Sequence, residues 1–591
     1  MTGKFMDFKV SFKPDGKNLT IRAGATIFEA AVRAGIIINA SCGGRGTCGK
    51  CRVTLEHDGS EVLACQCRVH RDMIISVPES SRFHDQKILR HGVDREINIL
   101  PLVSKKLIEI TSVHTDDLKD NIGGPEEFTI SDEALDDLEL IAKDLPQPAT
   151  AVFFGNSLIA VEHGDTTLEI YGVAVDIGTT TVVAKLVDLI DGQVLAISAT
   201  GNPQRAFGDD VISRISYGET QEGLDQEHNV IVECVNSLIF RLCEDSGKKA
   251  SSIYEVTIAG NTTMSHILLK LPVKQLGQAP YHAYSVDAFD RPAKKMNINI
   301  APAGNIHTIE NIAGFVGSDT VACAVAVAMD QQTAMTLCVD IGTNGEIILG
   351  TKTKMYSASC AAGPAFEGAR IGQGSRAVEG AIERVSIKND DLVIETIAHV
   401  TPRTICGSGL IDAVAILVDK GIIDYTGRFV KPEDLKGKIS DALVARVIPL
   451  ENEQFGFILA HAGSAGEPQV ILTQRDIRET QLSKAAIRAG IKLLMKKFGI
   501  NDDQIGRILL AGAFGNYIRR ESARRIGLLP NVPLEKIEFV GNAASSGAQM
   551  ILLSKECRDL AGKLAREIEY VEIAHEADFQ MAFADCMMFD E

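Results

Sequence analysis

Two stretches of the chain share one pattern of apolar and polar positions. In each, a continuous apolar run ends in an aspartate, a glycine turn with hydroxyl residues follows, and a second apolar run begins. The first copy covers residues 172–187 and the second covers residues 337–349. Short apolar runs bounded by turn residues are typical of buried strands. We therefore predict two strand–turn–strand hairpins, with Asp176 and Asp340 at the ends of their first strands.

Two further stretches predict helices made mostly of small residues. Glycine-rich residues 311–320 precede a small-residue run at 322–328, and Gly541 opens a second small-residue helix that includes Gly547. Short side chains allow two helices to approach closely, so we expect these helices to contact each other.

In the N-terminal stretch, the spacing of apolar positions changes from every second residue, typical of strands, to about every 3.6 residues, typical of a helix. Residues 6–13 and 19–22 predict two strands around a turn at 14–17, and Thr26 is a candidate N-cap for the helix that follows. A further strand is expected at residues 52–55.

The region after residue 81 has a looser pattern. Residues 82–100 mix charged and isolated apolar positions, which favours a linker. Short strands are expected at 106–110, 151–154 and 157–161, the last two joined by a Gly-Asn turn, and a helix from Ser131 to about Lys143. No catalytic constellation occurs here, so we interpret this region as a small α/β spacer or docking domain.

Composition narrows the class of protein. The 591 residues are 45% hydrophobic and 23% charged, with a net charge of −18, which is typical of a folded multidomain protein. This negative net charge argues against nucleic acid and anionic membranes as partners. The N-terminal residues contain no apolar segment typical of a secretory signal, and the longest apolar run is about half of a bilayer span. We expect a soluble cytoplasmic protein.

The thirteen cysteines are unevenly distributed. Five of them lie between Cys42 and Cys67, and the others are scattered through apolar runs as expected for buried thiols. In a reducing compartment, a tight group of cysteines indicates metal or cluster ligation.

The cysteine group resembles a known cluster-binding pattern. The spacing Cys-x5-Cys-x2-Cys over Cys42–Cys51, in a glycine-rich loop, is similar to 2Fe–2S ferredoxin domains of the β-grasp fold, closest to their adrenodoxin-type branch. The resemblance implies a 2Fe–2S cluster bound by Cys42, Cys48, Cys51 and Cys65. Cys67 is the alternative fourth ligand. A four-cysteine zinc site is the competing interpretation, although the Cys65-x-Cys67 spacing is too short for a second zinc knuckle.

The two hairpin turns carry groups suited to phosphate. Glycine lets backbone N–H groups approach phosphate oxygens, threonine hydroxyls add donors, and an aspartate at the strand end can hold Mg²⁺ or orient a water. A single such turn is a weak signal, whereas two copies are much more specific. The candidate nucleotide-binding residues are Gly178, Thr179, Thr180, Thr181, Gly342, Thr343, Asn344 and Gly345.

The order of these segments resembles the ATPase superfamily of actin, sugar kinases and heat-shock chaperones, over residues 169–591. By that resemblance, Gly512, Ala513 and Gly515 lie near the adenosine, Asp176 and Asp340 act on the phosphates with Mg²⁺, and the helices after Gly317 and Gly541 form a hinge. The implied fold is a two-lobed, ribonuclease-H-like ATPase.

Three other segments have two interpretations each. Asn261 and Thr262 either face the nucleotide or cap the next helix, and His266 is more simply a core histidine than a ligand. Residues 363–368 and 406–409 are expected at loop-to-helix junctions that could bind an anion, with Cys406 a buried structural thiol rather than a redox group.

Both modules in one chain resemble the reductive activators of corrinoid-dependent methyltransferases. Family-like phrases include residues 202–211, both Val-Asp-Ile-Gly-Thr turns and residues 510–515. The implied organisation is a multidomain α/β and α+β protein: a 2Fe–2S domain (1–84), a linker (85–100), a middle domain (101–168) and an actin-like ATPase domain (169–591).

The resemblance also implies a function. An activator of this kind uses ATP to pass one electron from its cluster to a corrinoid protein, converting inactive cobalt(II) to cobalt(I). It implies an upstream electron donor, and related activators suggest a homodimer. Three alternatives stay open: an electron-transfer subunit of an oxidoreductase, although the chain has no Gly-x-Gly-x-x-Gly dinucleotide motif, a redox-sensing small-molecule kinase, and a chaperone whose cluster reports redox state.

Overall fold

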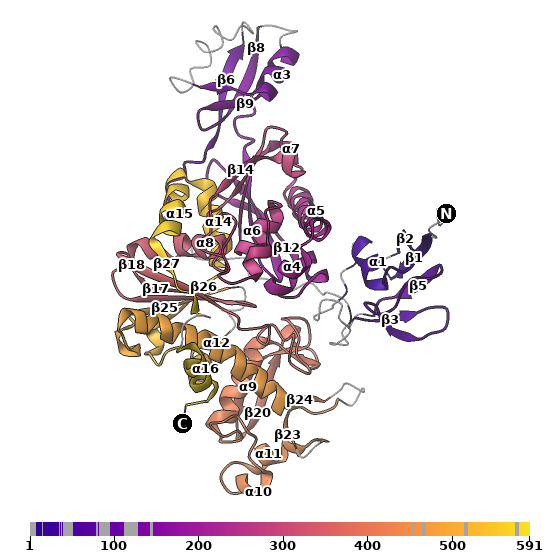
Figure 1. Ribbon diagram of the computed structural model, residues 1–591, viewed down its shortest axis with the longest axis vertical. Coiled ribbons are helices and arrows are strands. Elements are labelled where there is room, and N and C mark those ends of the chain that lie inside the picture. Colours follow the sequence, from indigo (N-terminus) through magenta and orange to yellow (C-terminus); the bar gives the residue numbers. More distant parts are fainter. Residues whose placement is uncertain are drawn as a thin grey trace.

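The computed structural model consists of two small bodies and a large two-lobed body (Figure 1). It describes residues 7–14, 16–34, 36, 38, 51–78, 81, 95–110, 128–141, 146–451, 454–463, 469–512, 518–573 and 578–590. No helix among these residues is long and apolar enough to cross a membrane.

The first small body is a five-stranded sheet covered by one helix. The strand order is β2-β1-β5-β3-β4, in which β1 and β5 are parallel and the other neighbours antiparallel. The elements are β1 (Asp7–Lys13), β2 (Lys17–Arg22), α1 (Ile27–Arg33), β3 (Arg52–Leu55), β4 (Glu61–Leu63) and β5 (Met73–Ser76). Phe28 of α1 and Phe12 of β1 are buried in one core, so the helix packs on the sheet as expected for a β-grasp fold.

The N-cap predicted for α1 is present. The Glu29 backbone N–H donates to Thr26 Oγ1 at 3.1 Å, and the Thr26 N–H donates to Glu29 Oε2 at 2.8 Å. This reciprocal capping box satisfies two backbone donors that the first helical turn leaves unpaired.

The second small body is a four-stranded sheet with the order β6-β8-β9-β7. Its elements are β6 (Val103–Ile110), β7 (Thr129–Ile130), α3 (Asp132–Ile141), β8 (Gln147–Phe154) and β9 (Ser157–His163). Leu138 of α3 packs with Ile108 and Phe153 from the sheet. The three predicted strands and the helix are confirmed, and each strand is longer than expected.

Each lobe of the large body is built on a six-stranded sheet. The first has the order β12-β11-β10-β13-β15-β14 and the second the order β26-β25-β16-β17-β18-β27. Both sheets contain an antiparallel hairpin, β10–β11 in the first and β16–β17 in the second. The first strand of each hairpin pairs in parallel with a later strand, β10 with β13 and β16 with β25. The sequence repeat therefore corresponds to a structural repeat, and the two-lobed ribonuclease-H-like fold is confirmed.

The elements of the two lobes have the following bounds. The first lobe contains β10 (Tyr171–Ile177), β11 (Thr181–Asp188), β12 (Val194–Gly201), the 3-10 helix η3 (Pro203–Ala206), α4 (Val211–Tyr217), α5 (Gln221–Ser246), β13 (Ile253–Gly260), α6 (Thr262–Leu268), β14 (Phe289–Pro292), α7 (Ala293–Met296) and β15 (Asn305–Thr308). The second contains β16 (Thr336–Ile341), β17 (Gly345–Thr351), β18 (Lys354–Cys360), α12 (Gln474–Phe498), β25 (Arg507–Ala511), α13 (Arg520–Arg525), β26 (Ile537–Gly541), β27 (Ile568–Tyr570) and α16 (Phe579–Met587).

Two small-residue helices, α8 (Ser318–Ala326) and α14 (Ala543–Leu553), lie against each other between the sheets (Figure 1). Together with α15 (Lys555–Glu567) they share one buried core with residues of both sheets. A Cβ atom at Gly547 would overlap the carbonyl oxygen of Ala322. The predicted contact between the two helices is confirmed, and glycine is what permits it.

A smaller subdomain extends from the second lobe. It contains two three-stranded sheets, β20-β19-β21 and β22-β23-β24. Its elements are β19 (Ala381–Lys388), β20 (Asp391–Thr396), β21 (Thr404–Ile405), α9 (Gly407–Asp419), α10 (Pro432–Leu435), α11 (Asp441–Ala445), β22 (Val447–Pro449), β23 (Phe455–Ala460) and β24 (Val470–Thr473). Residues 407–419 form the helix expected after Cys406, but no helix follows residues 363–368, so that prediction was wrong. The chain there turns on Gly363 and Gly368, both at positive φ.

Candidate functional site

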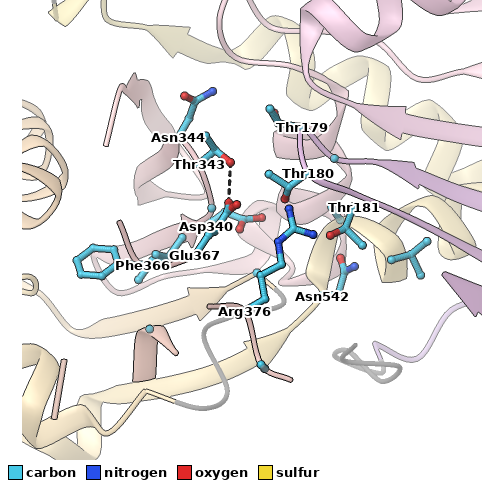
Figure 2. Close-up of a pocket in the computed structure, with 18 of the residues that line it drawn as sticks. Thr179, Thr180, Thr181, Asp340, Thr343, Asn344, Phe366, Glu367, Arg376 and Asn542 are labelled. Carbon is cyan, nitrogen blue, oxygen red and sulfur yellow. Dashed lines mark hydrogen bonds between the residues drawn. The ribbon is translucent and has the colours of Figure 1, made fainter. Parts of the chain in front are cut away.

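A cavity of about 200 Å³ lies between the two hairpin turns, where residues of both lobes meet (Figure 2). Strand pairing decides this position, because β10 and β16 occupy equivalent places in their sheets and each has an aspartate as its last residue but one. The lining residues from the two hairpins are Asp176, Gly178, Thr179, Thr180, Thr181, Val183, Asp340, Ile341, Gly342, Thr343, Asn344 and Glu346.

The first turn is closed by a backbone hydrogen bond from Gly178 N–H to the Thr181 carbonyl, 2.9 Å long. A Cβ at Gly178 would lie 2.8 Å from that carbonyl oxygen, so only glycine fits without a shift. The buried guanidinium group of Arg214 fixes the turn by donating hydrogen bonds to the carbonyl oxygens of Thr179 and Gly208. The Thr179–Thr181 segment is thereby held with its hydroxyl groups at the cavity (Figure 2).

The second turn repeats this arrangement. Gly342 N–H donates to the Asn344 carbonyl at 3.0 Å, and Thr343 Oγ1 donates to Glu367 Oε1 at 2.6 Å. A Cβ at Gly512, which has φ of +97°, would lie 2.5 Å from Asp340 Oδ1. Close approach of this loop to Asp340 therefore requires glycine.

Carboxylates dominate the electrostatics of the cavity. Burial raises the pKa of Asp176 and of Asp340 to about 7 each, and Asp319 adds to both shifts through charge repulsion. Burial also raises the pKa of Asp319 and of Glu346. A bound cation would favour the ionised carboxylates and lower these pKa values.

This donor set fits Mg²⁺ bound together with phosphate. No group of three or more His, Cys, Asp or Glu side chains within the described ranges could hold a metal ion by itself. Mg²⁺ typically uses one or two protein carboxylates and takes its other ligands from phosphate oxygens and water. Asp176 and Asp340, one from each lobe, supply such a pair.

Two of the predicted cluster ligands lie together in the N-terminal body. Cys51 Sγ and Cys65 Sγ are both buried and 3.3 Å apart, well beyond the length of a disulfide bond. The Ala64 N–H donates to the Cys51 carbonyl, which ties the two segments together. Soft thiolates converging on one point suit iron, so the pair fits a cluster. Cys42 and Cys48 lie outside the described residues.

Comparisons with known proteins cover nearly the whole chain. Residues 12–70 match the 2Fe-2S iron-sulfur cluster binding domain, residues 171–332 match the RACo middle region, and residues 334–591 match the C-terminal domain of RACo, the ASKHA domain. The corrinoid activation enzyme RamQ of Eubacterium limosum is 33% identical over 97% of this chain and 98% of its own length. The chain belongs to the family of reductive activators of corrinoid proteins.

Two other relatives of this activator agree with that placement. The [Co(II) methylated amine-specific corrinoid protein] reductase of Methanosarcina barkeri is 24% identical over 67% of this chain and 73% of its own. A solved structure, the reductive activator for corrinoid, iron-sulfur protein, superposes with a TM-score of 0.75 at 33% identity, covering 98% of each chain. The activator accordingly uses a 2Fe–2S cluster, ATP and Mg²⁺ as its cofactors.

The fold of the activator brings most of the predicted nucleotide residues together. Ten of them line the cavity: Asp176, Gly178, Thr179, Thr180, Thr181, Asp340, Gly342, Thr343, Asn344 and Gly512. Gly345 is not among the residues that line it, so its contact with the nucleotide stays a prediction. It is the first residue of β17, and a Cβ there would meet Ile487 of α12 at 2.7 Å. Ala513 and Gly515 lie outside the described residues.

The open interpretations of the polar residues are resolved by their contacts. Asn261 does both things expected of it, since its side chain accepts from Thr263 N–H at the start of α6 and it also lines the cavity. His266 Nδ1 donates to the Thr262 carbonyl and Nε2 accepts from Tyr284 N–H, as expected for a core histidine. Cys406 is buried and donates to the Ile382 carbonyl, although it also lines the cavity.

Several lining residues of the activator were missed in the sequence. They are Asp319, Glu346, Phe366, Glu367, Arg376, Glu383 and Asn542. For Arg376 a signal exists, because it follows a glycine-rich segment at residues 372–375 that resembles an anion-binding loop. Apart from Glu383, the others lie in segments singled out above, but no local pattern marked these side chains as lining residues, and only folding places them beside the hairpin turns.

Proposed function

We propose that this chain uses ATP to drive the reduction of a corrinoid protein, in which cobalt(II) gains one electron and becomes cobalt(I). The observation that carries the proposal is that one chain holds a convergent pair of buried thiols, Cys51 and Cys65, and a two-hairpin cavity between lobes. Full-length likeness to corrinoid activation enzymes supports the same conclusion.

Energetics explain why such a reaction needs ATP. Plant-type 2Fe–2S clusters have reduction potentials near about −400 mV, and the cobalt(II)/cobalt(I) couple is lower. Each ~59 mV of mismatch changes a one-electron equilibrium tenfold, so a gap of roughly 120 mV leaves about one site in a hundred reduced. ATP helps only if the nucleotide-bound activator binds the two cobalt states with different affinities.

The cluster is assigned to Cys42, Cys48, Cys51 and Cys65. When bound, it supplies a one-electron carrier. The buried Sγ pair of Cys51 and Cys65 supports two of these ligands, and the half-buried Cys67 is the alternative for the fourth position. An external reductant must return one electron to this domain after each transfer, so the chain also requires an upstream electron donor.

The nucleotide is assigned to the cavity between the lobes. The Thr179–Thr181 and Thr343–Asn344 segments would donate to the phosphates through backbone N–H groups and hydroxyls. Asp176 and Asp340 would hold Mg²⁺ and orient the attacking water. Gly512 would lie near the adenosine of the nucleotide. It has no side chain, so its backbone can lie close to Asp340 without overlap.

The organisation and partners follow from the same assignment. We place domain boundaries at residues 84, 100 and 168, and expect a homodimer in the cytoplasm. The described cysteines form no disulfide bond with one another, which suits a reducing compartment. Nucleic acid and membranes are not expected as partners, given the net charge of −18.

Visible spectroscopy tests the function directly. The purified protein, reduced without oxygen, is mixed with a cobalt(II) corrinoid protein with and without ATP. We expect the cobalt(I) band to appear with ATP and only weakly without it. Absence of an ATP-dependent band would exclude the function, and phosphorylation of a small molecule instead would favour the kinase alternative.

A variant pair ties the activity to the cavity. Asp340→Asn should lower ATP-dependent cobalt(I) formation by ~100-fold or more, because it removes a carboxylate that positions Mg²⁺ and water. Asp245→Asn, on the exposed end of α5, is the matched control and should retain full activity. The visible spectrum of the cluster checks that both variants are loaded.

A further inference from the structure

Arg376 occupies an unusual place in the cavity. Among the described residues that line it, Arg376 is the one basic side chain. Figure 2 shows its guanidinium extending toward Thr180 and Thr181 of the first turn. The acidic lining residues are Asp176, Asp319, Asp340, Glu346, Glu367 and Glu383.

The environment of Arg376 favours the binding of an anion by its guanidinium group. Burial and, to a smaller extent, the positive charge of Arg205 lower the pKa of Arg376 to about 9. The group is still protonated near neutral pH, so the cavity holds one positive charge among its carboxylates. A buried cation gains more from an anionic partner than an exposed one, and the planar fork of arginine matches phosphate oxygens in pairs.

A second pair of charges, Arg205 and Asp209, lies close enough to Arg376 to affect its pKa. Arg205 donates from Nε and Nη2 to Asp209 Oδ1, at 3.2 and 3.1 Å. Both residues influence the charge state of Arg376, so the three side chains form one electrostatic group. Asp209 Oδ2 is buried and has no hydrogen-bond partner in the described part of the chain.

Arg205 and Asp209 belong to a segment that connects the cavity with the N-terminal domain. We call residues 202–209 the docking segment. At one end, Asn202 N–H donates to the Thr180 carbonyl at 2.9 Å, and its side-chain amide donates to the Gly178 carbonyl at 2.8 Å. The docking segment is therefore bonded to the first nucleotide turn.

The other face of the docking segment supports the domain that carries the cluster thiols. Ala206 packs against the core of that domain. A second cavity of about 210 Å³ lies at this junction, lined by Phe28, Ile38, Arg205 and Asp209 among others. The same ion pair thus lies near Arg376 and also lines the cavity beside the cluster domain.

We propose that Arg376 binds the terminal phosphate of the nucleoside triphosphate and, through the Arg205–Asp209 pair, changes how the docking segment supports the N-terminal domain. A terminal phosphate draws the guanidinium toward the turns and weakens its coupling to Asp209. ADP lacks that phosphate and leaves Arg376 beside the pair. The inference rests on the proposed function only for nucleotide binding, and its tests contain no corrinoid protein.

Nucleotide affinity tests the first half. We expect Arg376→Gln to weaken binding of a non-hydrolysable ATP analogue by ~10- to 100-fold, as for loss of a charged hydrogen bond, while ADP affinity changes little. Arg376→Lys should fall between the two, because lysine keeps the charge but not the fork. Arg370→Ala, an exposed arginine on the same loop, is the control.

Titration calorimetry on the full-length, cluster-loaded protein measures these affinities. Equal losses for the ATP analogue and ADP in Arg376→Gln would overturn the assignment, because a purely structural arginine would affect both. Native protein that binds neither nucleotide would instead refute the proposed function.

Amide hydrogen exchange tests the second half. At saturating nucleotide, native protein should show different exchange over α1 and the docking segment with the ATP analogue than with ADP. Arg376→Gln and Asp209→Asn should abolish that difference, whereas Arg370→Ala should retain it. If the difference in exchange persists in both variants, these residues do not couple the bound nucleotide to the N-terminal domain.

Discussion

The side-chain amide of Asn542 donates a hydrogen bond to the Asp176 carboxylate, with 3.1 Å between Nδ2 and Oδ2, although 366 positions separate them in the chain. Asp176 belongs to β10 of the first lobe, and Asn542 caps α14 directly after β26 of the second lobe. The bond therefore joins the two halves at the bottom of the cavity. It also lowers the pKa of Asp176 against the stronger effect of burial.

Asn542→Asp should weaken nucleotide binding. The substitution keeps an oxygen that can accept from Ser545 N–H, so the cap on α14 is preserved, but it replaces a donor to Asp176 with a like charge. We expect ~10-fold lower affinity for ATP with Mg²⁺, measured by calorimetry. Asn531→Asp, on the exposed surface, is the control, and an unchanged affinity in Asn542→Asp would show that the bond has no part in binding.

Cys65→Ala should abolish the cluster, whereas Cys67→Ala should retain it. The reason is geometric, because Cys65 Sγ lies beside Cys51 Sγ in the core and no such contact is recorded between Cys67 and another described thiol. Iron content and the visible spectrum after anaerobic reconstitution measure the outcome. Cys243→Ala, a half-buried thiol on α5, should keep full iron content. Loss of iron in Cys67→Ala alone would reverse the assignment of the fourth ligand.

Gly547→Ala should destabilise the two-lobed body. The added methyl group would overlap the Ala322 carbonyl, so α8 and α14 must separate, at a cost of about 1–3 kcal/mol. A lower thermal midpoint and weaker ATP binding are expected, since both helices lie under the cavity. Ser546→Ala, at the neighbouring buried position, adds no atoms and is the control. A midpoint unchanged from the native protein would contradict the packing argument.

Glu227→Gln should remove a pH-dependent loss of stability. Burial raises the pKa of Glu227 to about 8, an effect that the nearby Arg214 only partly opposes. The folded state then holds more protons than the unfolded state between about pH 5 and pH 8, so the free energy of unfolding falls as pH rises. Glutamine resembles the protonated carboxyl group and does not ionise.

The thermal midpoint of Glu227→Gln should therefore exceed that of the native protein by more at pH 8 than at pH 6. Scanning fluorimetry at both values measures the difference. Glu222→Gln, exposed one turn earlier on α5, should show no such trend. An equal offset at the two pH values would contradict this prediction, because it would mean that Glu227 does not titrate between pH 6 and pH 8.

Local patterns carried much of the prediction. The hairpins that hold Asp176 and Asp340 were predicted because apolar runs, aspartates and glycines lie next to one another in the chain. The capping of α1 by Thr26 was predicted for the same reason, since the groups that satisfy a first helical turn are only three residues apart. The order of residues along the chain is a poorer guide to the direction in which a residue points: Gly345 follows the turn, but strand alternation directs it to α12.

The amino-acid sequence by itself determined which segments carry the chemistry: a run of thiols, two phosphate-type turns and two helices of small residues. Only the tertiary structure decided that Asn542 would meet Asp176, and that Arg376 would stand between the nucleotide turns and the Arg205–Asp209 pair. Spacing along the chain encodes hydrogen bonds within a turn or a helix. Contacts between lobes depend on how strand order and helix packing place distant segments, and no local pattern records that.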